Sequence, residues 1–149
     1  DAAFRFGGVS ATHGPITGDW NADGRDSVGI YDSPAGKVHL RNSLSSGAAD
    51  LAFSFGPKNE NWTALAGDWN GDGIDTIGLY DPADSRFSLR DSHTSGAADT
   101  AGRFGPRGSG WMPLAGDWEG HGSDGLALYD DDMGRVLLRK DAQVIAGGR

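Results

Sequence analysis

The chain has 149 residues, of which 25 are glycine and none is cysteine, and its formal net charge is −8. The length suits one domain with a modest core, and the lack of cysteine excludes disulfides and thiolate metal sites. The acidic charge argues against a nucleic-acid partner, which needs a basic face. No apolar run approaches the roughly 18 residues of a membrane-spanning helix, so we expect no membrane insertion.

A seven-residue motif recurs at intervals of 49 residues. It reads GDWNADG from Gly18, GDWNGDG from Gly67 and GDWEGHG from Gly116. Flanking stretches recur in the same register, such as SVGIYD from Ser27 and TIGLYD from Thr76. A period of this length is typical of propeller blades or solenoid units. The sequence therefore predicts a single domain over 1–149, with repeats at 18–66, 67–115, and 116–149 completed by 1–17.

Each repeat carries the pattern of four short strands. In the second repeat these lie in WTALAGDW from Trp62, DTIGLYD from Asp75, SRFSLRD from Ser85 and ADTAGRFG from Ala98. Clusters of Gly, Pro, Asp and Asn bound them, as strand and turn chemistry requires, and no stretch shows a sustained helical period. The sequence therefore predicts an all-β fold whose repeats are β-propeller blades of four antiparallel strands.

The two ends of the chain together supply one repeat. The third repeat stops after its third strand, in DAQVIAGGR from Asp141, and a fourth-strand pattern stands instead at the amino terminus, in DAAFRFGG from Asp1. Three blades are fewer than the usual four to about eight. We therefore expect a homodimer whose two chains complete a six-bladed ring without exposed strand edges. The alternative is a fragment of a longer tandem array.

The recurring motif alternates carboxylate and amide side chains in a tight glycine-containing loop. Hard oxygen ligands of this kind suit Ca²⁺, whereas the alternative is an Asp/Asn/Gly turn without metal. An EF-hand is excluded because its bidentate glutamate is replaced by Ile30, Leu79 and Leu128 and strands flank the loop. The candidate ligands are Asp19, Asn21, Asp23, the Arg25 carbonyl and Asp26 in the first loop, Asp68, Asn70, Asp72, the Ile74 carbonyl and Asp75 in the second, and Asp117 and Asp124 in the third.

The third loop departs from this pattern. Glu119 replaces the asparagine and His121 replaces the central aspartate. Histidine is a poor calcium ligand, so we expect this loop to bind Ca²⁺ weakly or to remain empty.

With FGP at Phe55 and Phe104, these loops resemble the FG-GAP or VCBS repeats of integrin-type calcium-binding β-propellers. The resemblance extends through all three repeats, and it implies a loop that binds Ca²⁺ between the first two strands of each blade. In that family the last carboxylate often stands at position nine of the loop. Here it stands at position eight, and Ser27 and Thr76 occupy position nine.

The aromatic residues fall into two groups. Trp20, Trp69 and Trp118 recur in every loop, and we expect them to pack between blades and brace the loops. Trp62 and Trp111 precede the first strand of their repeats, where the first repeat has His13. A tryptophan on a polar loop is either a platform on which a sugar stacks or a filler between blades, and the sequence leaves both open.

The sequence contains no recognisable set of nucleophile, acid and base, so we expect no enzyme. The first hypothesis is a secreted, non-catalytic, calcium-stabilised carbohydrate-binding module, because propellers similar to this one include fungal and bacterial lectins. The alternative is a protein-recognition or adhesion scaffold appended to a secreted protein, so the partner is a glycan or a surface protein. A start at Asp1 without an apolar leader is expected of a processed, exported chain or an excised domain.

Overall fold

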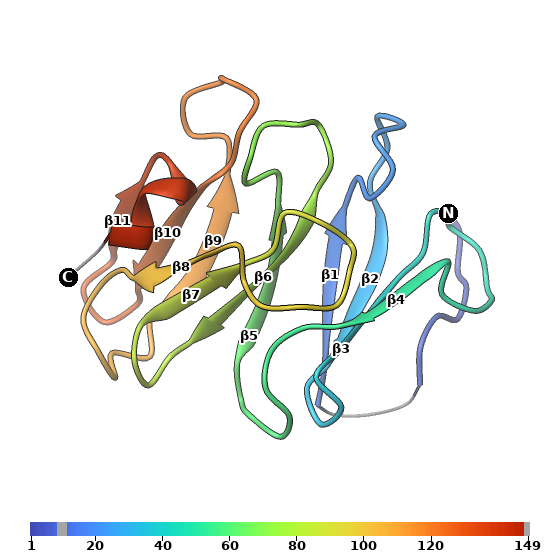
Figure 1. Ribbon diagram of the computed structural model, residues 1–149, viewed down its shortest axis with the longest axis horizontal. Coiled ribbons are helices and arrows are strands. Elements are labelled where there is room, and N and C mark those ends of the chain that lie inside the picture. The colour runs from blue at the N-terminus through green and yellow to red at the C-terminus, as the bar shows by residue number, and fades with distance from the viewer. Residues whose placement is uncertain (9–11, 148–149) are drawn as a thin grey trace.

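The computed structural model describes residues 1–8 and 12–147, which form three antiparallel sheets in a row, one for each repeat (Figure 1). Within each sheet the strands pair in sequence order, so each sheet is a meander. The first contains β1 (His13–Gly18), β2 (Ser27–Asp32), β3 (Lys37–Leu40) and β4 (Leu51–Ser54), the second β5 (Thr63–Gly67), β6 (Thr76–Asp81), β7 (Arg86–Leu89) and β8 (Thr100–Arg103), and the third β9 (Met112–Gly116), β10 (Gly125–Asp130) and β11 (Arg135–Arg139).

The all-β prediction is confirmed, and the first two repeats each supply four strands. The third sheet has three strands, and the described residues form an open row of sheets rather than a closed ring. A short 3₁₀ helix, η1 (Ala142–Gly147), follows β11 where the sequence predicted no helix. Residues 9–11 and 148–149, which belong to the predicted third repeat, lie outside the described residues. Among the described residues, no helix has the length and hydrophobicity to cross a membrane.

The sheets stack through two apolar cores, and the second sheet takes part in both. Successive side chains of β6 point to opposite faces of the sheet. Ile77 and Leu79 therefore enter the core shared with the first sheet, whereas Tyr80 enters the core shared with the third. All of β6 from Thr76 to Tyr80 is buried, as expected of a strand covered on both faces.

The junctions between neighbouring sheets repeat the same contacts. The ring of His93, in the loop after β7, lies 6.3 Å from that of Trp20, and its Nε2 lies 3.1 Å from the Trp20 carbonyl oxygen. At the next junction, Gln143 donates from Nε2 to the carbonyl oxygen of Trp69 at 3.1 Å, although the residue 49 positions after His93 is its neighbour Ala142. The segment after the third strand of the second and third sheets thus bonds the loop tryptophan of the sheet before it.

We expect the junction at His93 to weaken in acid. Burial lowers the pKa of His93, although the Trp20 carbonyl and the charge of Asp72 act in the opposite direction. Since the folded protein then favours the neutral ring, stability is complete above the ordinary pKa of about 6.5 and falls as the pH drops through it. Unfolding midpoints at pH 7.5 and 5.5 should differ less in His93→Gln, because glutamine does not titrate and its amide can donate to a tryptophan carbonyl, as Gln143 does at the next junction. The exposed His121 provides the control: His121→Gln should keep the full difference, and equal behaviour of the two variants would contradict the prediction.

Candidate metal loops and ligand-binding hollows

The three GDW loops project from the same end of the sheets, at the top of Figure 1, because each joins the first two strands of its sheet. In the first loop the Asp19 carboxylate accepts the backbone N–H of Asp23 at 3.1 Å and of Gly24 at 2.8 Å. Asp68 accepts the N–H groups of Asp72 and Gly73 at 3.1 and 2.8 Å in the second loop. The first aspartate therefore organises each loop by capping its backbone donors.

Both of the first two loops bring together oxygen atoms of the kind that calcium prefers. Asp19, Asn21 and Asp23 lie within one turn, and Asn21 Nδ2 donates to Asp23 Oδ2 at 3.1 Å. Asn70 and Asp72 make the same contact at 3.0 Å. A cation between these groups would require the amide to turn its oxygen toward the carboxylate. With the backbone carbonyl at Arg25 or Ile74, each loop would supply four of the six to about eight oxygens that Ca²⁺ takes, leaving the others to water.

The aspartate at position eight of the loop contacts the neighbouring sheet. Asp75 Oδ2 accepts the backbone N–H of Asp19 at 2.8 Å, and Asp124 Oδ2 accepts that of Asp68 at 2.9 Å. Backbone bonds in return join the N–H groups of Asp75 and Asp124 to the carbonyls of Asp19 and Asp68. We call this reciprocal pair of bonds the aspartate clasp. Asp26, at position eight of the first loop, is exposed.

Burial raises the pKa values of the two clasp carboxylates. At Asp75 the bond from the Asp19 N–H partly offsets this, and the negative charges of Asp124, Asp26 and Asp68 raise the pKa further. At Asp124 the charges of Asp68 and Asp117 also raise it. These carboxylates therefore gather negative charge along the end of the sheets from which the loops project. A bound cation there would relieve the repulsion.

The third loop is arranged differently. Asp117 still accepts backbone N–H groups, from His121 at 3.1 Å and from Gly122 at 2.8 Å, and these bonds lower its pKa. Glu119, which stands where the other loops have asparagine, accepts from Lys140 Nζ at 2.7 Å. Since a lysine already neutralises this carboxylate, the third loop is poorly suited to Ca²⁺.

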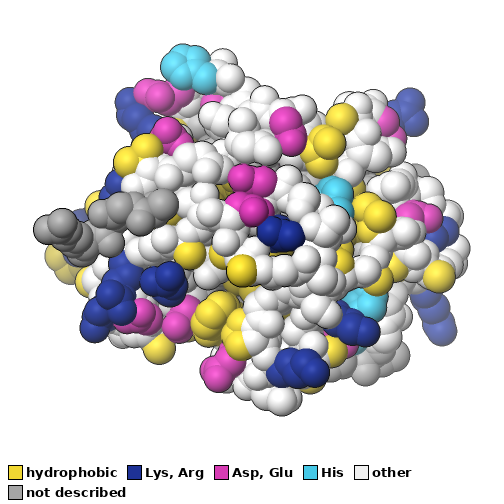
Figure 2. Space-filling view, viewed as in Figure 1, with side chains coloured by type: hydrophobic (Ala, Val, Ile, Leu, Met, Phe, Trp, Pro, Cys, Tyr) yellow, Lys and Arg dark blue, Asp and Glu magenta, His cyan; other side chains and the backbone are white. Residues whose placement is uncertain are grey.

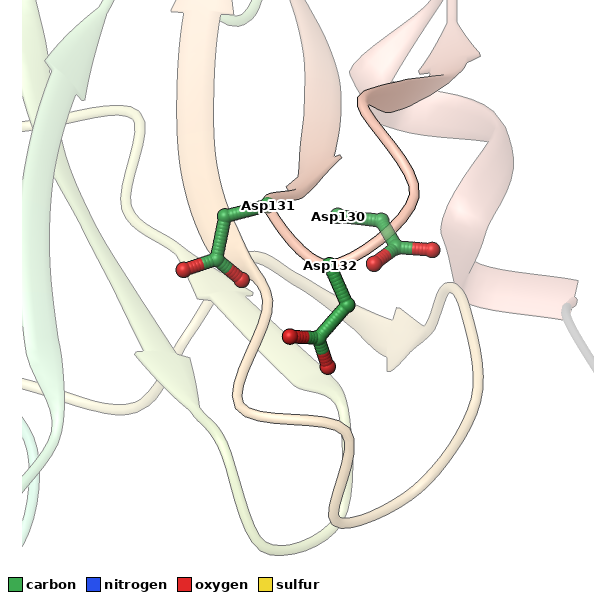
Figure 3. Close-up of side chains that lie close together, drawn as sticks. All are labelled: Asp130, Asp131 and Asp132. Atoms are coloured by element: carbon green, nitrogen blue, oxygen red, sulfur yellow. The ribbon is translucent and has the colours of Figure 1, made fainter.

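A separate carboxylate trio, Asp130, Asp131 and Asp132, lies in the turn between β10 and β11 (Figure 3). The sequence analysis did not select it, although three consecutive aspartates could have drawn attention. Asp130 is 3% exposed and accepts from Arg135 Nη2 at 2.9 Å. Because this ion pair already neutralises the one buried member, the trio carries no metal assignment.

The loop tryptophans are not equivalent. Trp20 and Trp69 are 2% and 1% exposed and lie in the two cores, as expected of residues that pack between sheets. Trp118 is 37% exposed, because in the described chain no further sheet lies beyond the third.

The other aromatic positions lie at the opposite end of the sheets from the GDW loops, because they stand where the first strand of each sheet begins. At about 3.3 Å per residue, a five-residue strand separates the two ends by roughly 15 Å. Trp111 lines a hollow of about 470 Å³ between the second and third sheets, together with Thr63, Tyr80 and Tyr129. Trp62 packs at the edge of the first core.

His13 lines a second hollow, of about 460 Å³, on the first sheet. Asp32 and His39 lie in the same hollow, and His13 Nε2 is 3.8 Å from Asp32 Oδ1. The sequence did not lead us to select Asp32 or His39 in this hollow, or Tyr129 in the hollow at Trp111. The recurrent Tyr-Asp pair that ends each second strand could have indicated Asp32 and Tyr129, because it lies directly across from the start of the first strand.

Acidic, basic and apolar side chains are interspersed over the face of the molecule drawn in Figure 2. Comparisons with protein-family models, with curated proteins and with solved structures found no match to this chain. The interpretation of its function therefore depends on the geometry of the loops and hollows.

Proposed function

We propose that the chain is a secreted, non-catalytic carbohydrate-binding module, built as a calcium-stabilised β-propeller of the FG-GAP or VCBS type. Its repeats would be the blades, and two chains would complete a ring of six sheets. One meander sheet per 49-residue repeat supports this reading, as do the identical contacts at the two junctions. The carboxylates Asp75 and Asp124, whose pKa values are raised, bond neighbouring backbone and so have a structural role.

The hollow at Trp111 is the observation that carries the carbohydrate proposal. The apolar face of a sugar ring packs on an indole, while hydroxyls such as those of Thr63 and Tyr129 hydrogen-bond to its edge. Arg135 lies 5.6 Å from the centre of the Trp111 ring and restrains its orientation. The hollow at His13 offers Asp32 and His39 as polar partners for a second, similar ligand.

A glycan array in calcium, followed by calorimetry with any sugar that binds, tests this proposal. Trp111→Ala should reduce affinity at least about tenfold, in the range expected for a contact aromatic. Trp62→Ala, the same change one repeat earlier, should reduce it far less, because Trp62 is not among the residues that line this hollow, although both indoles pack at the edge of a core. An inert array with folded protein would favour the alternative, a protein-recognition scaffold.

The proposal assigns calcium a structural role at the first two loops. Calorimetry on chelator-treated protein should show two calcium sites per chain, and Asp23→Ala and Asp72→Ala should each remove one. His121→Ala should leave both. Added Ca²⁺ at about 100 times its dissociation constant should stabilise the fold by about 2.7 kcal/mol for each occupied site. Because the loops lie roughly 15 Å from the hollows, sugar binding should persist in chelator while the protein stays folded. The absence of binding heat would refute the calcium assignment.

A further inference from the structure

The face of the third sheet that points away from the second is apolar and exposed. Its side chains correspond, 49 residues on, to side chains that the second sheet buries. Leu114, Trp118, Val136 and Leu138 are 37 to 57% exposed, whereas their counterparts Leu65, Trp69, Phe87 and Leu89 are at most 8% exposed. We call these four exposed residues the third-sheet face. It has the composition of a buried sheet-to-sheet interface without a covering layer.

The two internal junctions show what kind of surface covers such a face. The corresponding face of the second sheet is covered by Leu126 and Leu128 of β10, and that of the first sheet is covered by Ile77 and Leu79 of β6. The corresponding residues of β2 are Val28 and Ile30, which are half-buried on the far side of the first sheet. We call these two residues the first-sheet face. The two faces lie at opposite ends of the row of sheets (Figure 1), so one copy of the chain has no way to join them.

At each end of the row of sheets, the residues that would form one side of an aspartate clasp lack the other side. Asp75 and Asp124 each bond the loop of the preceding sheet. In the described part of the chain, Asp26 has no preceding loop and Asp117 has no following one. Leu44 occupies the position that corresponds to His93, which packs on Trp20, and is 61% exposed. By the same correspondence, its partner would be the exposed Trp118.

The amino-terminal segment already lies where the fourth strand of a preceding sheet would end. Arg5 N–H donates to Ser46 Oγ at 3.0 Å, and one repeat later Ser54 N–H donates to Ser95 Oγ at 2.9 Å. A Cβ at Gly7 would lie 2.2 Å from Ile30 Cδ1, and one at Gly56 would lie 2.3 Å from Leu79 Cδ1. Residues 4–8 therefore repeat the contacts that the end of β4 makes with the second sheet.

Strand pairing extends this correspondence. β8 pairs with β7, with Arg103 opposite Arg86 and Gly102 opposite Phe87. Residues 2–5 are the equivalent of β8 two repeats earlier in the sequence. Residues 135–138 of β11 are the equivalent of β7 one repeat later. The outer edge of β11 carries no strand among the described residues. Residues 2–5 thus stand at the sequence position of a fourth strand for such an edge. Residues 4–8 already make the contacts expected at the end of that strand.

We propose that a second copy of this chain covers the third-sheet face with its first-sheet face and adds its residues 2–5 to β11 as a fourth strand. Asp26 of that copy would then close the aspartate clasp on the Asp117 backbone, and its Leu44 would cover Trp118. The same junction made in return joins two copies into a closed ring, because a head-to-tail contact either closes or propagates as a filament. This inference rests on the six-sheet ring proposed above, but on neither its calcium nor its sugar.

Solution mass and a designed cross-link test the junction in the full chain. Light scattering at micromolar concentration should give twice the mass of the 15.6 kDa chain, in calcium and in chelator. Val136→Lys should weaken association at least about tenfold, since it places a charge in an apolar interface. Val136 is 57% exposed in one copy, so the variant should stay folded. Val144→Lys is the matched control: Val144 is 56% exposed but lies on η1, and dimerisation should persist.

Because the chain lacks cysteine, a disulfide can report the strand pairing directly. Phe4→Cys with Val136→Cys places thiols at positions that correspond to the paired Gly102 and Phe87. This double variant should oxidise to a covalent two-chain species, and Phe4→Cys with Val144→Cys should not. A mass of one chain, a mass of more than two, or equal cross-linking of both pairs would overturn the proposal. Calcium and glycan binding are measured separately, so a monomer that retains both would refute this junction alone.

Discussion

Replacing Trp69 by alanine is expected to lower the free energy of unfolding by about 3–5 kcal/mol, the usual range for a buried tryptophan. The side chain is 1% exposed and lies in the core between the second and third sheets. Its Nε1 donates to the carbonyl oxygen of Ile77 at 3.3 Å. The substitution therefore leaves a cavity and removes one of two hydrogen bonds to the Ile77 carbonyl, which also accepts from the Arg90 N–H at 3.0 Å. Denaturant unfolding in chelator measures the loss without a contribution from calcium binding.

Trp118→Ala is the matched control, because it makes the same change at the same position of the third repeat. Trp118 is 37% exposed in one copy, so its loss should cost clearly less than the loss of Trp69 at concentrations at which the chain is monomeric. At concentrations that favour the proposed dimer, the cost should increase. Equal losses for the two tryptophans in dilute solution would contradict the difference in packing between the second and third sheets.

The second large effect is expected at the aspartate clasp. Asp75→Ala should cost about 1–3 kcal/mol, because it removes the acceptor of the Asp19 N–H and leaves that donor partly buried and unpaired. The junction between the first and second sheets should loosen with it. Hydrogen exchange of β1 and β5, which lie side by side across this junction, would show faster exchange than in the unsubstituted chain.

Asp75→Asn separates the hydrogen bond from the charge. The amide keeps an oxygen acceptor for the Asp19 N–H, and it removes a carboxylate whose ionised form is disfavoured by burial and by neighbouring aspartates. In chelator this variant should be about as stable as the unsubstituted chain at pH 7. If asparagine and alanine proved equally destabilising, the clasp would not depend on the oxygen acceptor.

The periodicity of the sequence was sufficient to predict the strands. The 49-residue interval placed four strands in the second repeat, and all four are present as β5 to β8. The alternation of residue types along a strand does not show whether one or both of its faces are covered. The burial of β6 on both faces was therefore not predicted. The helix η1 was missed because six residues are too few for a helical period. Its Ile145 packs in the core between the second and third sheets, a contact that local sequence does not encode.

The candidate site was predictable to the extent that it is local. The spacing of Asp19, Asn21 and Asp23 within one turn follows directly from the loop sequence. The contact of Asp75 with Asp19 spans 56 residues and appears only when two sheets stack. The unequal burial of Trp69 and Trp118 has the same origin, because both follow the same Gly-Asp pair and differ in whether another sheet lies beyond them.

Because each junction reuses one set of contacts, the proposed six-sheet ring would have a modular composition. Stability should then be close to a sum of sheet terms and nearest-neighbour junction terms, as in solenoid proteins. A chain shortened to two repeats would need three copies to supply six sheets, whereas two copies fused in tandem would need no partner. The fusion would make the two intermolecular junctions intramolecular, and its stability would no longer depend on protein concentration.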